Sequence, residues 1–109
     1  MRRAPNRDKG EPAIVAALRA VGATVGMLDL SGGPDLLVGF RGVNFLFEIK
    51  DPIGPHGGTS RDGQQLSERQ LKWHRAWRGN VDVVRSPQEA LLAIHAITPS
   101  EVTRQEEIR

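Results

Sequence analysis

The chain has 109 residues, of which 39% are hydrophobic and 26% charged, an ordinary composition for one globular domain. It has no cysteine, which excludes disulfide scaffolds, thiolate catalysis and thiolate-bound zinc. The formal net charge of +2 is too small to establish nucleic-acid binding. No apolar run could span a bilayer, and no apolar segment follows the basic N-terminus, so we expect a cytoplasmic protein with no membrane partner.

Periodicity predicts the elements of the first half. Apolar residues at helical spacing predict a helix that begins near Asp8 or Lys9 and stops at Gly22. Three strands are expected next, over residues 24–30, 35–40 and 43–50. Arg41-Gly42 is predicted as the tight turn between the last two strands. The polar stretch 51–65, rich in glycine and proline, has a length typical of a functional loop or of disorder.

The second half predicts two helices separated by a strand. Their expected ranges are a helix over 67–78, a strand over 81–85 and a helix over 86–96. Each helix begins with the spacing of a capping box, Ser67 with Gln70 and Ser86 with Glu89. Two segments are expected to be flexible tails, residues 1–7 and 98–109. The order α-β-β-β-α-β-α predicts one domain with a mixed α/β sheet, a central antiparallel hairpin and flanking helices.

The register of that hairpin brings charged residues together. A two-residue loop at Arg41-Gly42 places Asp35 directly opposite Glu48. Strand alternation puts Glu48 and Lys50 on one face, away from the apolar residues of the same strand. Opposed carboxylates destabilise a strand pair, but a bound Mg²⁺ or Mn²⁺ reverses the sign. The pattern predicts metal-assisted hydrolysis of a phosphate ester, with Lys50 orienting or deprotonating a metal-bound water.

Each of these residues also has a structural interpretation. Asp35 could cap a turn after Pro34, and Glu48 with Lys50 could form an exposed, salt-bridged face. A longer hairpin loop would also make the pairing of Asp35 with Glu48 diagonal.

The order of the motifs resembles the PD-(D/E)xK nuclease superfamily. Pro34-Asp35 is followed by Glu48-Ile49-Lys50 and, after a polar loop, by Leu66-Ser67-Glu68-Arg69-Gln70. This order is similar to that of small stand-alone VRR-NUC and Holliday-junction-resolvase-like nucleases of phages and bacteria, over about residues 8–94. The resemblance implies a restriction-endonuclease-like fold and a Mg²⁺-dependent DNA endonuclease, with branched or Holliday-junction DNA as the expected substrate. It also implies the cytoplasm of a bacterium or of a phage-infected host.

The resemblance further implies a role for each motif residue. Asp35 and Glu48 would bind the catalytic Mg²⁺, for which Mn²⁺ would substitute, and the carbonyl of Ile49 would add a ligand. Lys50 would position or activate the water. No organic cofactor is expected.

Two helical residues match further positions of these nucleases. Glu11 matches the acidic residue of the first helix, a second metal or water ligand, and lies on the inward face of its helix. Its alternative role is a capping box with Asp8. Gln70 matches the glutamine that contacts the active site or a DNA phosphate, and its alternative role is the capping box with Ser67.

The helix of Gln70 carries other candidate residues. Trp73 and Trp77 share its face and are expected in the core, with base stacking as the alternative. His74 could reach a phosphate. The candidate phosphate-contacting residues, whose alternative is a solvated charged face, are Arg61, Arg69, Lys72, Arg75 and Arg78.

The small size of the chain favours a homodimer, which would match the two-fold character of a DNA junction. Two other functions stay open: a nuclease fold without turnover that binds DNA or regulates, and a protein that inhibits a host factor.

Overall fold

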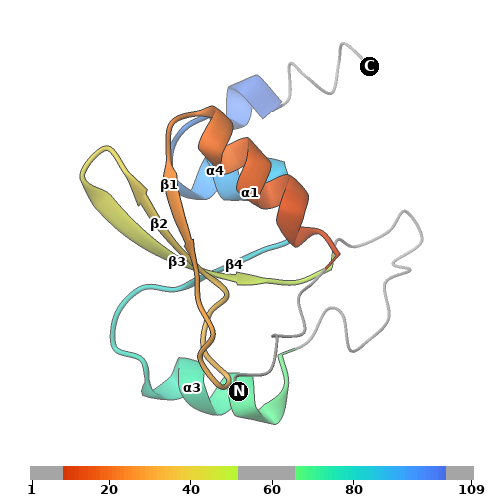
Figure 1. Ribbon diagram of the computed structural model, residues 1–109, viewed down its shortest axis with the longest axis vertical. Helices are drawn as coiled ribbons and strands as arrows, with labels where there is room; N and C mark the ends of the chain where they lie inside the picture. The colour runs from red at the N-terminus through yellow and green to blue at the C-terminus, as the bar shows by residue number, and fades with distance from the viewer. Residues whose placement is uncertain (1–8, 52–65, 103–109) are drawn as a thin grey trace.

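A computed structural model describes residues 9–51 and 66–102 of the chain (Figure 1). Its elements are α1 (Glu11–Ala20), β1 (Thr24–Met27), β2 (Leu36–Phe40), β3 (Val43–Ile49), α3 (Glu68–Ala76), β4 (Asp82–Val84) and α4 (Pro87–Ala93). The predicted α/β class, with a mixed sheet, a central hairpin and flanking helices, is confirmed.

The four strands form one sheet in the order β1-β2-β3-β4. The first two pairings are antiparallel, and β4 runs parallel to β3. The hairpin has the predicted two-residue loop, because Phe40 pairs with Val43 and Arg41 and Gly42 lie between them. Both loop residues have positive φ, 51° and 80°, as a type I′ turn requires. Arg41 is an unusual residue at such an angle, and this weak turn signal still gave the correct register.

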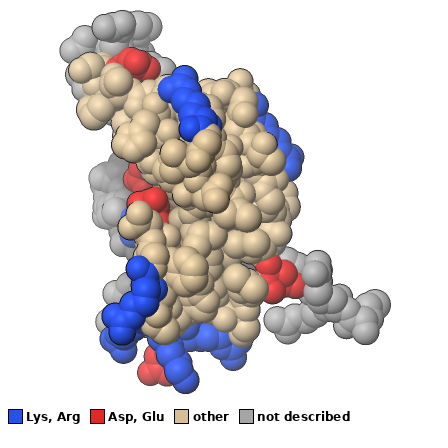
Figure 2. All heavy atoms as spheres, turned by 90° about the vertical axis from the view of Figure 1, so that its left-hand side faces the viewer, with Lys and Arg blue, Asp and Glu red and all other residues tan. Residues whose placement is uncertain are grey.

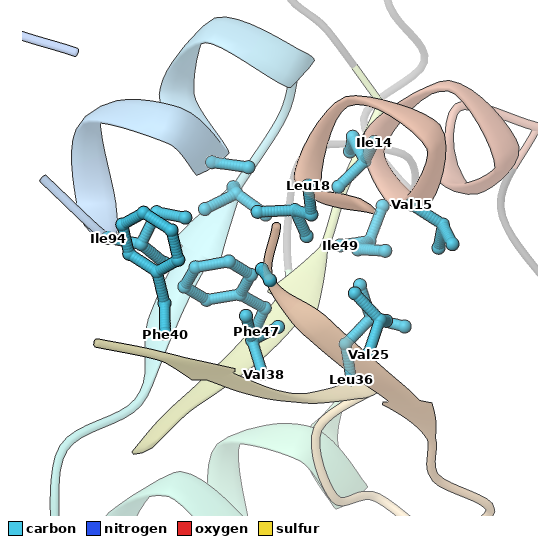
Figure 3. Close-up of a cluster of buried hydrophobic side chains, with 13 residues drawn as sticks. Ile14, Val15, Leu18, Val25, Leu36, Val38, Phe40, Phe47, Ile49 and Ile94 are labelled. Carbon is cyan, nitrogen blue, oxygen red and sulfur yellow. The ribbon is translucent and has the colours of Figure 1, made fainter. Parts of the chain in front are cut away.

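One face of the sheet carries the hydrophobic core. Figure 1 shows α1 and α4 together on this face and α3 on the opposite side of the sheet. Alternate residues of the strands, such as Leu36, Val38, Phe47 and Ile49, are fully buried and point toward α1 and α4 (Figure 3). The opposite face is therefore left for other side chains of β3, including Glu48.

The boundaries of the first elements differ from those predicted. The first helix begins at Glu11, with Gly10 as its N-cap, and not at Asp8 or Lys9. The first strand ends at Met27, because the chain then turns, and the amide of Gly33 donates to the carbonyl of Leu30 at 3.0 Å.

Two segments nearer the C-terminus also differ from what was predicted. Helix α3 ends at Ala76, because Trp77 takes an extended conformation. The predicted flexible tail contains a helical turn over 99–102, because the side chain of Thr98 accepts a hydrogen bond from the amide of Glu101 at 3.2 Å.

Most of the predicted loop, residues 52–65, lies outside the described residues. In the part of the chain that is described, no helix combines the length and the apolar character needed to cross a bilayer.

Candidate active site

Glu48 is the buried acid of the sheet. It lies in β3 between Phe47 and Ile49, which point into the core, so its side chain points to the opposite face. There it is 1% exposed. The exposed, salt-bridged face considered for Glu48 is therefore wrong. A buried carboxylate needs polar partners, and α3 supplies them.

Gln70 of α3 connects Glu48 to Lys50. Its Nε2 donates to Oε2 of Glu48 at 3.0 Å, and its Oε1 accepts from Nζ of Lys50 at 3.0 Å. The same Oε1 accepts from the amide of Ser67 at 2.9 Å, and the amide of Gln70 donates to Oγ of Ser67 at 3.2 Å. The two roles considered for Gln70 are thus combined: one amide caps α3 and orients two predicted site residues.

Asp35 ties the start of β2 to the end of β3. The Cα pairing of these strands ends at Leu36 with Phe47, and the amide of Asp35 donates to the carbonyl of Phe47 at 2.8 Å. The paired residues have the predicted register, and the pairing ends one step before Asp35 and Glu48. The Asp35 carboxylate accepts, through Oδ2, the amide of Ile49 at 2.7 Å. This bond holds the Asp35 carboxylate against the peptide that joins Glu48 to Ile49.

His74 lies one turn after Gln70 and also faces Glu48. Its Nε2 is 3.5 Å from Oε1 of Glu48. Burial lowers the pKa of the His74 imidazole, and the nearby Lys50 ammonium lowers it further. A lowered pKa favours the neutral imidazole, for which the 3.5 Å contact is a long hydrogen bond. The sequence placed His74 on the correct helix but did not indicate this partner.

Glu11 is buried, at 5% exposure, in the first turn of α1. It lies one turn before Ile14 and Val15, which pack near Ile49 of β3 (Figure 3). Glu11 stays a predicted metal or water ligand. Within residues 9–51 and 66–102, no three His, Cys, Asp or Glu side chains form a group that could hold a metal ion. Its alternative, a capping box, involves Asp8, which lies outside the described residues.

The predicted phosphate-contacting residues of the α3 region are exposed. Figure 2 shows Lys and Arg side chains gathered at the end of the molecule that α3 forms. The exposed members of this basic surface are Arg69, Lys72, Arg75 and Arg78. The predicted Arg61 lies outside the described residues.

The expectation that Trp73 and Trp77 belong to the core is wrong. Helix α3 has no buried residue, Trp73 is half-buried and Trp77 is 42% exposed. The core lies on the other face of the sheet, so the helical pattern of these tryptophans could not reveal which surface they meet.

Arg85 is a candidate that the sequence did not single out. It directly follows Val84, whose carbonyl accepts the amide of Lys50 at 3.0 Å, so its backbone lies beside the end of β3. Its side-chain Nε is buried and has no hydrogen-bond partner among the described residues. In the sequence, Arg85 was only the last residue of the strand expected over 81–85. The structure adds the parallel pairing of β4 with β3, which places the ends of both strands at one edge of the sheet.

Three features together define a nuclease-like fold. They are the mixed sheet, the pair Glu48 and Lys50 at the end of β3, and Gln70 from the facing helix α3. A solved VRR_NUC domain confirms this class: it matches with a TM-score of 0.59 and 28% sequence identity, over 83% of this chain and 95% of that chain. The chain thus resembles a VRR_NUC domain, which is a PD-(D/E)xK nuclease fold, as the motifs indicated. Neither a scan against protein-family models nor a search among curated proteins finds a match.

Proposed function

We propose that this chain is a metal-dependent endonuclease that hydrolyses DNA phosphodiester bonds, with branched DNA as its expected substrate. The observation that carries the proposal is the buried Glu48, linked through the Gln70 amide to Lys50, in a fold that resembles a VRR_NUC domain. A purely structural surface has little reason to bury a carboxylate in this way, because burial costs free energy that polar partners must offset.

The donor set fits a hard divalent cation. The carboxylates of Asp35 and Glu48 and the carbonyl of Ile49 are oxygen ligands, which Mg²⁺ and Mn²⁺ prefer. The 2.7 Å hydrogen bond from the Ile49 amide holds the Asp35 carboxylate beside the end of β3. Mg²⁺ usually keeps several waters, so these few protein ligands fit it, with Glu11 as the further predicted metal or water ligand.

These three residues would hold the ion, and a bound Mg²⁺ would supply Lewis-acid polarisation of the phosphate and a more acidic water. Side chains of the protein would orient the water and stabilise the charge on the phosphate. Lys50 orients the attacking water, and Gln70 fixes the positions of Lys50 and Glu48. The guanidinium of Arg85 and the basic surface of α3 stabilise the phosphate charge.

The test is a cleavage assay on labelled single-stranded, linear duplex and four-way-junction DNA, with Mg²⁺, Mn²⁺, Ca²⁺ or chelator. Cutting should require Mg²⁺ or Mn²⁺. Asp35→Asn, Glu48→Gln and Lys50→Ala should each reduce the rate at least about a hundredfold. Asp82→Asn is the matched control, because Asp82 is an exposed acid of the same sheet, and its rate should be unchanged.

Two outcomes would contradict the proposal. Equal rates for Glu48→Gln and the Asp82 control would remove the buried acid from the reaction. A folded protein that cuts no substrate, and binds DNA in chelator with an affinity that Asp35→Ala leaves unchanged, would favour a DNA-binding module without turnover.

We also propose that the active form is a homodimer. The small footprint of a 109-residue chain and the two-fold character of a junction support this proposal. Light scattering at micromolar concentration should give twice the chain mass, and a monomeric mass in the presence of junction DNA would refute it.

A further inference from the structure

Helix α3 is held on the sheet without any share in the hydrophobic core. None of its residues is buried. On one side, Gln70 bonds to Glu48 and Lys50, and His74 lies beside Glu48. A helix without a buried apolar face is easily displaced, because tertiary packing supplies most of the stability of helices in proteins. The placement of Gln70 therefore depends on whatever else contacts α3.

The loop between β1 and β2 makes such a contact. Figure 1 shows this segment reaching from the end of β1 to α3. The guanidinium of Arg69 donates to Oγ of Ser31 at 3.1 Å. A Cβ added at Gly32 would lie 2.8 Å from the carbonyl oxygen of Arg69, and one added at Gly33 would lie 3.2 Å from Nε1 of Trp73. The bare backbone of two consecutive glycines thus lies against two residues that are one turn apart on α3.

Two neighbouring rows of α3 meet two different parts of the protein. Arg69 and Trp73 contact the loop. The residue after each of them, Gln70 and His74 respectively, contacts Glu48. Residues four apart lie on one side of a helix, and consecutive residues are turned by about 100° from each other. The loop therefore sets both the distance and the rotation at which α3 presents its polar row to the buried acid.

Gly32 has the most direct connection to this row. An added Cβ would lie 2.8 Å from the carbonyl oxygen of Arg69 and 3.1 Å from its carbonyl carbon. These two atoms belong to the peptide that joins Arg69 to Gln70. Backbone atoms cannot turn away as the end of a side chain can, and contacts this short are well inside the optimal separation of non-bonded atoms. A side chain at position 32 would therefore displace the backbone of Gln70 from the loop.

We propose that Gly32 is a positioning residue of the candidate active site, which docks α3 at the distance that lets the Gln70 amide bridge Glu48 and Lys50. The bridge tolerates little displacement, because its two hydrogen bonds are already 3.0 Å long and such bonds are lost beyond about 3.5 Å. The effect on DNA cleavage rests on the proposed function, whereas the docking of α3 does not.

The kinetics of DNA cleavage give the first test, with Gly42→Ala as the matched control. Gly42 also has a positive φ, 80°, but a Cβ added there would meet nothing within 4 Å. We expect Gly32→Ala to lower kcat at least about tenfold, because a small displacement misplaces the reacting groups. Its KM for DNA, and its Kd measured by anisotropy in chelator, should stay within about twofold of the original values, as should kcat of Gly42→Ala.

A double substitution shows whether Gly32 acts through Gln70. The bridge is absent from Gln70→Ala, so the addition of Gly32→Ala should change kcat by less than about twofold. Circular dichroism under the assay conditions shows that each variant is folded.

Tryptophan fluorescence reports the docking of α3 without any cleavage. The chain has two tryptophans and no tyrosine, so Trp73 is the single emitter in a Trp77→Phe background. We expect Gly32→Ala to raise the acrylamide quenching of Trp73 about twofold, because α3 leaves the loop more often, and Gly42→Ala to leave it unchanged. Ser31→Ala is a milder second variant, which removes only the acceptor of the Arg69 guanidinium and should raise the quenching in the same direction.

Equal kcat or equal quenching in Gly32→Ala and Gly42→Ala would overturn the proposal, as would additive losses in the double variant. Weaker DNA binding by Gly32→Ala with unchanged kcat would also overturn it, in favour of a loop that contacts DNA. A wild-type protein that cuts no DNA would refute the proposed function alone, and the quenching comparison would then decide whether Gly32 docks α3.

Discussion

Replacing Gln70 by alanine should destabilise the fold far more than removal of a helix cap. The Gln70 side chain makes hydrogen bonds to Glu48, Lys50 and the amide of Ser67. Hydrogen bonds to charged groups contribute about 1.5–3 kcal/mol, and neutral ones about 1 kcal/mol. Water cannot replace Gln70 at Glu48, which is 1% exposed, but it can do so in part at half-buried Lys50 and exposed Ser67.

We therefore expect Gln70→Ala to lower the free energy of unfolding by about 3 kcal/mol. Ser67→Ala removes only the cap hydroxyl and should cost about 1 kcal/mol. The difference corresponds to a Tm lower by about 10 °C for a chain of this size. Gln70→Glu should cost at least as much as Gln70→Ala, because it places a second carboxylate against Glu48.

The assay is equilibrium urea denaturation in chelator, followed by far-ultraviolet circular dichroism. Equal losses in Gln70→Ala and Ser67→Ala would refute the reasoning, because the bonds to Glu48 and Lys50 would then contribute nothing beyond the cap. A stable Gln70→Glu variant would show that Glu48 does not depend on a donor from α3.

Two further substitutions test how the site is held together. Gly32→Ala should cost at least about 1 kcal/mol more than Gly42→Ala in the same denaturation assay. Both glycines have positive φ, but only at Gly32 would an added Cβ meet Arg69, at 2.8 Å from its carbonyl oxygen. Similar losses of unfolding free energy in the two variants would mean that α3 is not closely packed against Gly32. Asp35→Ala should cost about 2 kcal/mol, because it removes the acceptor of the buried Ile49 amide. Asp35→Asn, which keeps an oxygen acceptor, should cost clearly less, and a thermal melt that ranks the two in the opposite order would contradict this role.

The elements of this fold could be predicted because they depend on local chemistry. The turn at Arg41-Gly42 fixed the hairpin register, and strand alternation then separated Glu48 from the core side of β3. The serine caps at Ser67 and Ser86 marked the starts of α3 and α4. Each of these signals acts within a few residues, so one sequence is enough to detect it.

The errors at the helix and strand ends have the same local origin. Helix α1 begins two or three residues later than expected, since Gly10 is its N-cap and has no side chain to signal the position. Strand β1 ends at Met27, the amide of Leu28 still donates to the carbonyl of Asp35 at 2.8 Å, and the chain then turns at residues 30–33, which the composition of 24–30 does not show.

The sequence by itself determined which residues share a face, but not what each face meets. Only the tertiary structure decided that α3 covers Glu48, that one amide of Gln70 serves both the cap and the site, and that Trp77 stays at the surface. The physical reason is that burial, pKa and side-chain pairing depend on elements far apart in the chain. Amphipathic patterns give the direction of a side chain along its own element, whereas the packing of α3 against the polar face of the sheet is set by a few long-range hydrogen bonds.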